Sequence, residues 1–175
     1  MKTEDLLNIP TLRRVVEDGL PVVDPIEALD EGEILDVRWE PWRASLGAVL
    51  RLVSDAGGGT GVVVARRVQR LEYTSSFERN FVGHRAIGRV TMSLNDGGLS
   101  AAFPISKRES VRIECEALAL VVGDGFIDGA PAAIPDYTSM GEEQLERAQP
   151  AWRFSFKPRG IVVFGDLARS VETGR

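Results

Sequence analysis

The sequence has very few of the residues on which thiol and metal chemistry depend. It contains one cysteine, Cys115, and one histidine, His84. An internal disulfide is therefore excluded, as is a zinc site made of several histidines and cysteines. No Gly-x-Ser-x-Gly nucleophile motif occurs, and Cys115 stands among apolar residues, where a buried and inert thiol is expected. We therefore predict no catalytic residue, no metal and no cofactor.

Long apolar runs are missing as well. No run approaches the roughly 20 residues that a membrane-spanning helix needs, and Met1–Asp5 lacks the apolar stretch of a secretion signal. A pI near 5.0 argues against nucleic-acid binding, which requires a net basic face. Together with the single cysteine, these features predict a cytoplasmic protein that binds neither membrane nor nucleic acid.

The length and composition fit one globular domain over residues 1–175. A chain of 175 residues, with 43% hydrophobic and 27% charged residues, can bury a core of its own. Residues 1–8 and 167–175 show no pattern that would tie them down, so we expect both ends to be poorly ordered. The sequence shows no internal repeat.

The charges are sorted into blocks along the chain. Residues 15–37 carry eight carboxylates and no Lys or Arg, and residues 113–146 again carry eight and none. Residues 38–112, between these blocks, carry twelve bases against six acids. Only Glu114 and Glu116 have a ready explanation, since they can face Arg residues on neighbouring strands. The other carboxylates suggest an acidic surface that steers a basic partner.

Alternation of apolar residues predicts strands through the middle of the chain. Leu35, Val37 and Trp39 alternate with charged residues, so we expect Trp39 in the core, whereas Trp42 after Pro41 is out of phase and partly exposed. A second run spans 46–52. A third spans 62–73, and its phase slips at residues 66–67, which suggests a β-bulge.

The second half of the chain continues the strand pattern. Residues 90–94 and 99–103 flank Asn95–Gly98, whose residues suit a tight hairpin. Ser110–Val122 reads as one long strand whose C-terminal end is buried on both faces. Alternating aromatic residues at 152–156 and a short apolar run at 160–165 predict a terminal hairpin.

Two helices are predicted. Thr11–Asp18 has an apolar face and is followed by Gly19. Ser139 and Glu142 form a capping-box pattern, so a late helix should run to Ala148 and end before Pro150. The predicted fold class is mainly β: an antiparallel β-sandwich or open barrel with one N-terminal and one late peripheral α-helix.

Three segments in the last third of the chain carry a resemblance. Ala119–Gly125, Pro135-Asp136 and Pro150–Trp152 resemble segments of a group of small uncharacterised bacterial proteins without functional assignment. This resemblance agrees with the predicted fold class, and it implies no activity, substrate or cofactor.

Several loops can be read either as sites or as plain connections. Gly57–Gly61 lacks the Lys-Ser/Thr pair and the helix of a phosphate loop, so it reads as a hairpin turn. Gly123–Gly129 lacks the βαβ setting of a dinucleotide site, and its aspartates lack calcium-loop spacing. Phe77–Arg85 is rich in Arg, Asn and His, and is either a binding loop or a connection between strands.

These observations favour a non-enzymatic cytoplasmic binding protein whose acidic surface engages a basic protein partner. The most concrete version is an immunity protein that neutralises a basic toxin, with the oligomeric state left open. One alternative is a sandwich or barrel with a pocket for a small apolar ligand, lined by Phe103, Leu118, Leu120, Phe154 and Phe156. Another is an enzyme that uses Asp124, Asp128 or Asp136 as general acid or base. The candidate partner-binding residues are Asp30, Glu31, Trp42, Arg79, His84, Asp124, Asp128, Glu142 and Glu143.

Overall fold

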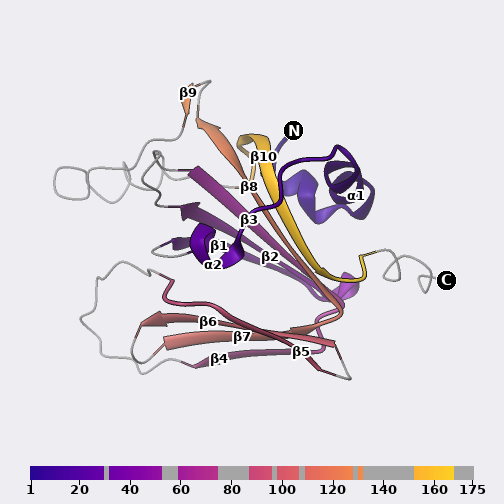
Figure 1. The fold of residues 1–175 in the computed structure, drawn as a ribbon, viewed down its shortest axis with the longest axis vertical. Helices are drawn as coiled ribbons and strands as arrows, with labels where there is room; N and C mark the ends of the chain where they lie inside the picture. Colours follow the sequence, from indigo (N-terminus) through magenta and orange to yellow (C-terminus); the bar gives the residue numbers. More distant parts are fainter. Residues whose placement is uncertain are drawn as a thin grey trace.

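The computed structural model describes residues 1–29, 32–52, 59–74, 87–95, 98–106, 109–127, 130–131 and 152–167. The described residues form a mainly antiparallel β structure in which two sheets pack face to face, as the fold-class prediction expected. Figure 1 shows the two sheets as separate layers, with α1 on the side of the larger sheet that faces away from the smaller one.

The larger sheet, sheet A, contains β1 (Glu33–Glu40), β2 (Ser45–Leu52), β3 (Gly59–Arg66), β8 (Ala117–Ile127) and β10 (Ser155–Gly165) in that order. A short strand, β9 (Ala130–Pro131), pairs with the end of β8. The smaller sheet, sheet B, has the order β4 (Arg70–Thr74), β7 (Glu109–Cys115), β6 (Gly98–Ser106) and β5 (Thr91–Asn95).

The hairpin predicted around Asn95–Gly98 is confirmed. Strands β5 and β6 pair antiparallel, with Asn95 opposite Gly98 and Leu94 opposite Leu99. Gly98 has φ +135°, a conformation that residues with a side chain rarely adopt. The turn chemistry in the sequence therefore predicted this connection correctly.

The chain crosses between the sheets at two places that the sequence analysis interpreted differently. The phase slip at residues 66–67 is not a bulge: β3 ends at Arg66, and Arg67, with φ 49°, turns the chain into β4 of the other sheet. The predicted single strand 110–122 is divided at Glu116 into β7 of sheet B and β8 of sheet A. Alternation continues through a sharp bend, so it cannot reveal a change of sheet.

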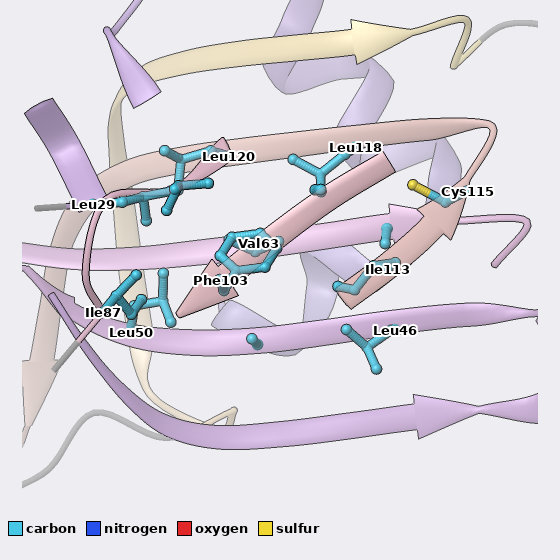
Figure 2. Close-up of a cluster of buried hydrophobic side chains, with 14 of the residues drawn as sticks. Leu29, Leu46, Leu50, Val63, Ile87, Phe103, Ile113, Cys115, Leu118 and Leu120 are labelled. Atoms are coloured by element: carbon cyan, nitrogen blue, oxygen red, sulfur yellow. The ribbon is translucent and has the colours of Figure 1, made fainter. Parts of the chain in front are cut away.

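The inner core lies between the two sheets. Sheet A contributes residues such as Leu50, Val63 and Leu120, and sheet B contributes Phe103 and Ile113. Figure 2 shows these side chains between the strands. Cys115 belongs to the same cluster and is fully buried, as its strand phase predicted.

An outer core covers the opposite face of sheet A. In β3, Val62 and Val64 point into this outer core whereas Val63 and Ala65 point into the inner one. Strand β8 divides in the same way, because Ala119 and Val121 are in the outer core while Leu118 and Leu120 are in the inner core. The prediction that this end of the 110–122 segment is buried on both faces is therefore confirmed.

Helical segments at the N-terminus supply the cover of the outer core. The 3-10 helix η1 (Thr3–Leu7) and the helix α1 (Ile9–Glu17) contribute Leu6, Leu7, Leu12 and Val15. The helix was predicted at 11–18. It begins two residues earlier because Pro10 is tolerated in the first helical turn, where its missing N–H has no intrahelical partner.

Residues 1–8 differ from the expectation of poor order. The backbone N–H of Thr3 donates to the carbonyl of Phe154 at 3.1 Å, and that of Glu4 donates to the carbonyl of Trp152 at 2.8 Å. Leu6 is fully buried. The reason is long-range: the partners lie about 150 residues away in the sequence, so no local pattern could show them. Residues 168–175 lie outside the described part of the chain.

Strand β1 has the predicted alternation but not the predicted burial. A bulge lies between Ile34 and Asp36, so Ile34 rather than Leu35 shares a face with Val37 and Trp39. Trp39, expected in the core, is 43% exposed. Trp39 lies on the inner face of β1, which is an edge strand of sheet A that sheet B does not fully cover.

The C-terminal part contains one continuous strand in place of the predicted hairpin. Strand β10 runs from Ser155 to Gly165 and pairs with β8 along its length, with an irregularity at Pro158–Gly160. Residues 21–23 run beside β10, where the N–H of Ile161 donates to the carbonyl of Pro21 at 2.9 Å. The chain then forms α2 (Pro25–Leu29), which was not predicted. The predicted helix 139–148 lies outside the described residues.

Candidate functional site

The described structure contains a cavity between the two sheets. Its volume is about 210 Å³. Strands of both sheets and the segment before β5 supply its walls. The lining residues are Ile34, Val37, Leu46, Ala48, Leu50, Val63, Leu71, Tyr73, Ile87, Phe103, Ile105, Val111 and Ile113.

The strand registers explain why these residues meet. Along β2, Leu46, Ala48 and Leu50 are separated by two residues, so all three point to the same face. In sheet B, Val111 is paired with Phe103 on one side and with Tyr73 on the other. Because both inner faces carry aliphatic and aromatic residues at every second position, the space between them is lined by carbon.

The cavity opens between the two edge strands, β1 and β4. Among the described lining residues, those that are exposed are Val37, Leu71 and Tyr73, with exposed fractions of 52%, 43% and 53%. Val37 lies on β1, and the other two lie on β4. In the described sheets, each of these strands ends the strand order. The mouth is therefore the unclosed side of the sandwich.

The segment before β1 packs on the inner core. Leu29 of α2 is buried there, and Val23 and Ala28 pack against the same cluster. Residues 21–23 run along β10, the opposite edge of sheet A from β1. One edge of sheet A is thus covered by its own chain, and the other forms a cavity mouth.

The cavity lining matches the predicted apolar pocket in character but not in most of its residues. Phe103 lines it as expected. Leu118 and Leu120 are in the inner core but are not lining residues, and Phe156 is in the outer core. Phe154, also predicted, does not line the cavity. The prediction failed for Phe156 because alternation does not tell which of two cores a residue of β10 enters, and Phe154 precedes β10.

Carboxylates from both acidic blocks pair with arginines in the described structure. Glu33 and Arg51 face each other across β1 and β2 and form a buried ion pair. Glu116 lies 3.4 Å from Arg67. Glu114 stands opposite Arg70 in the β4–β7 register, and its Oε1 is 3.9 Å from Nε of Arg112. The prediction that these residues face arginines on neighbouring strands is confirmed for Glu114, whereas Glu116 lies between strands and pairs with Arg67 at the crossing.

Of the predicted partner-binding residues, the structure describes two. Asp124, on β8, has its Oδ1 3.0 Å from Nη2 of Arg159. Trp42 lies in the short 3-10 helix η2 (Pro41–Arg43) and is 98% exposed, more than the partial exposure that its phase predicted. The other seven predicted residues lie outside the described part of the chain: Asp30, Glu31, Arg79, His84, Asp128, Glu142 and Glu143.

Two buried titratable groups lie away from the cavity mouth. Burial raises the pKa of the Cys115 thiol to about 11, so the thiol is protonated at neutral pH. Burial also lowers the pKa of Arg66, the positive charge of Arg43 lowers it further, and Glu40 acts in the opposite direction. Nη1 of Arg66 donates to the carbonyl of Leu7 at 3.3 Å. The burial of Cys115 and the hydrogen bond of Arg66 therefore fit structural roles for both residues.

Within the described ranges, no group of three or more His, Cys, Asp or Glu residues is placed to hold a metal ion. The same ranges contain no helix with the length and apolar character needed to cross a membrane. Comparison with known proteins finds no family model, no curated protein and no solved structure that matches the chain.

The cavity mouth was missed by the sequence reasoning. Leu71 and Tyr73 were assigned to the same run as Val62–Ala65, although they belong to the other sheet. The usable signal was the positively charged pair Arg66-Arg67, which interrupts that run. It indicated an irregularity correctly but could not indicate a crossing.

Proposed function

We propose that this chain is a non-catalytic cytoplasmic binding protein that holds a small apolar molecule between its two sheets. The observation that supports this proposal is the cavity of about 210 Å³, whose walls are apolar and whose mouth opens between β1 and β4. Clefts of this kind, lined mainly by hydrophobic residues, are the usual form of small-molecule sites.

The size of the cavity limits the ligand. A dry apolar cavity of about 150 Å³ in another protein binds benzene, so 210 Å³ suits a molecule slightly larger than one ring. A ligand that buries about 200 Å² of apolar surface gains about 5 kcal/mol. Because association also costs entropy, the net binding free energy is smaller than this gain, and we expect a Kd of about 1 mM or weaker for a simple hydrocarbon probe.

Toluene is a suitable first probe, followed through the methyl resonances of isotope-labelled protein. Saturable shifts are expected for Val63, Val111 and Ile113, which line the cavity. Val15 and Val62 in the outer core should not shift, because sheet A separates them from the cavity. Shifts that do not saturate, or that spread evenly over both cores, would contradict the proposal.

A pair of matched variants locates the site. Ala48→Met adds a flexible side chain at a position that lines the cavity, so toluene binding should be lost. Ala102→Met makes the same change opposite Arg112, on the outer face of sheet B, and should leave binding intact. Equal binding by both variants would place the probe elsewhere.

A second candidate function is the binding of a basic protein partner, including the neutralisation of a basic toxin. The observation that favours it is the exposed Trp42, since tryptophan often anchors a protein interface. Its weakness is that described carboxylates of both acidic blocks already pair with arginines. The carboxylates at 30, 31, 142 and 143 remain the proposed contact residues.

The product of the gene directly upstream is the partner to test. Charge reversal of Asp30, Glu31, Glu142 and Glu143 should slow association at low salt, and the wild-type rate should fall steeply as salt rises through about 0.15 M, where the Debye length is about 8 Å. Trp42→Ala should mainly accelerate dissociation. An association rate that ignores both salt and the four reversals would exclude acidic steering.

A further inference from the structure

Strand alternation turns the charged residues of β4 and β7 away from the cavity. Leu71 and Tyr73 line it, with Ile113 and Val111 opposite them in the register. The intervening positions pair Arg70 with Glu114 and Glu72 with Arg112, on the outer face of sheet B. The charges of this sheet therefore form their own ladder on the far side.

Sheet A has the same arrangement at the mouth. Val37 faces the cavity opposite Ala48. The next residue, Arg38, points to the opposite face, where its guanidinium lies 5.2 Å from the centre of the Trp152 ring. Glu33 and Arg51 also pair with each other on that face. Among the lining residues that the structure describes, none has a charged side chain.

The cost of burying charge decides what such a cavity can hold. An ionised carboxylate or ammonium group that leaves water without a partner loses far more free energy than apolar contact returns. An ionic ligand would therefore have to keep its charged end in water, with only part of its apolar body inside. A neutral ligand of the same size can enter completely.

Of the lining residues in the described part of the chain, Tyr73 is the one with a polar side-chain group. It lies at the mouth and is half exposed, so its ring can border the cavity while its hydroxyl remains near water. A phenol hydroxyl both donates and accepts hydrogen bonds. It can therefore bind a neutral hydroxyl or carbonyl at the open end of the cavity without needing a charged partner.

From this arrangement we infer that the ligand is an uncharged molecule with an apolar body and a single polar end, and that Tyr73 selects it by hydrogen bonding to that end. This inference rests on the proposed function and narrows it to a ligand class, such as short alcohols, phenols or ketones. The apolar body lies against Leu50, Val63 and Phe103, and the polar end lies at the mouth.

Three probes with the same six-carbon chain test the charge preference at pH 7.5: 1-hexanol, hexanoate and hexylammonium. Methyl-resonance titrations give a Kd for each. We expect hexanol to bind at least about tenfold more tightly than either ion, given the cost of an unpaired charge. If either ion binds as tightly as hexanol while toluene also binds, the charge inference is overturned and the proposed function stands. If neither toluene nor hexanol binds, both are overturned.

Tyr73→Phe tests the assigned hydrogen bond. Because Tyr73 is half exposed at an edge strand, the loss of its hydroxyl should not disturb the fold. We expect the Kd of hexanol to rise about 3- to 10-fold, the usual effect of one hydrogen bond, and the Kd of toluene to remain unchanged. If the Kd of hexanol and the Kd of toluene change equally, or if neither changes, the role of Tyr73 is overturned.

Discussion

Arg67 Nη1 lies 3.4 Å from Oε1 of Glu116, and each residue stands where the chain passes from one sheet to the other. The backbone adds a second link, because the N–H of Glu116 donates to the carbonyl of Arg66 at 3.1 Å. The two crossings are thus neighbours at one end of the sandwich. In Figure 1 the strands of the two sheets converge toward one end.

Removal of the Arg67–Glu116 pair should have a small, salt-dependent effect. Both side chains are about one-third exposed, so a coupling free energy of about 0.5 kcal/mol is expected. Urea unfolding of Arg67→Gln, Glu116→Gln and the double variant provides the cycle. The more exposed Arg70–Glu72 pair is the control and should show a coupling closer to zero. A larger coupling for the control would reverse this ranking.

Gly47→Ala should destabilise the protein strongly for a single methyl group. A Cβ at this position would lie 2.5 Å from Leu7 Cδ2 and 2.5 Å from Trp152 Cη2. Relief of such a clash inside a packed core costs about 1–3 kcal/mol. Gly88→Ala is the control, because its nearest neighbour would be at 3.5 Å. Equal thermal unfolding midpoints of Gly47→Ala and Gly88→Ala would mean that the outer core accommodates the added methyl group at little cost in stability.

Leu6→Ala should show that the N-terminal segment is part of the outer core. The side chain is fully buried, so its truncation should lower the free energy of unfolding by about 2–5 kcal/mol. Leu94→Ala, at a position that is 73% exposed, should change it by less than about 0.5 kcal/mol. If Leu6→Ala behaves like Leu94→Ala in chemical denaturation, the segment is not packed as described.

Cys115 should make the protein less stable in alkali. Its pKa is raised from 9.0 to about 11 by burial, so the unfolded chain loses this proton at lower pH than the folded one. The stabilising contribution is complete below pH 9 and declines between pH 9 and 11, with a slope of up to about 1.4 kcal/mol per pH unit.

The alkaline decline is measured as a difference between wild type and Cys115→Ala, because tyrosines and lysines titrate in both proteins. The difference in unfolding free energy should narrow from pH 9 to 11. A thiol reagent at pH 8 should also react far more slowly with folded than with unfolded wild type. A constant difference between the two proteins, together with equal thiol reactivity, would show that Cys115 is accessible.

Local patterns predicted the strands well because alternation and turn chemistry are properties of neighbouring residues. Asn95–Gly98 and the double burial of Leu118–Val121 followed directly from them. The division of a run between two sheets depends on distant partners. Arg67 and Glu116 interrupt their runs only slightly, so the sequence suggested a bulge at one and nothing at the other.

The candidate cavity could be anticipated only as a type of site. An apolar sandwich core made a pocket plausible, and Phe103 was chosen correctly. The exposure of Val37 and Trp39 could not be derived from β1 itself, since it depends on how far sheet B extends beneath that edge. The grouping of Glu33 with Arg51 and of Asp124 with Arg159 likewise required the registers and the folded backbone.

The hydrogen bonds that join Thr3 and Glu4 to residues 152–154 also set the order of events during synthesis. Thr3 and Glu4 leave the ribosome about 150 residues before the residues to which they are hydrogen-bonded. Until those partners emerge, the apolar face of α1 has no complete surface to cover, and β8 lacks its neighbour β10. A nascent chain that stops before residue 152 should therefore expose apolar surface, and it would depend on chaperones in a way that the finished molecule does not.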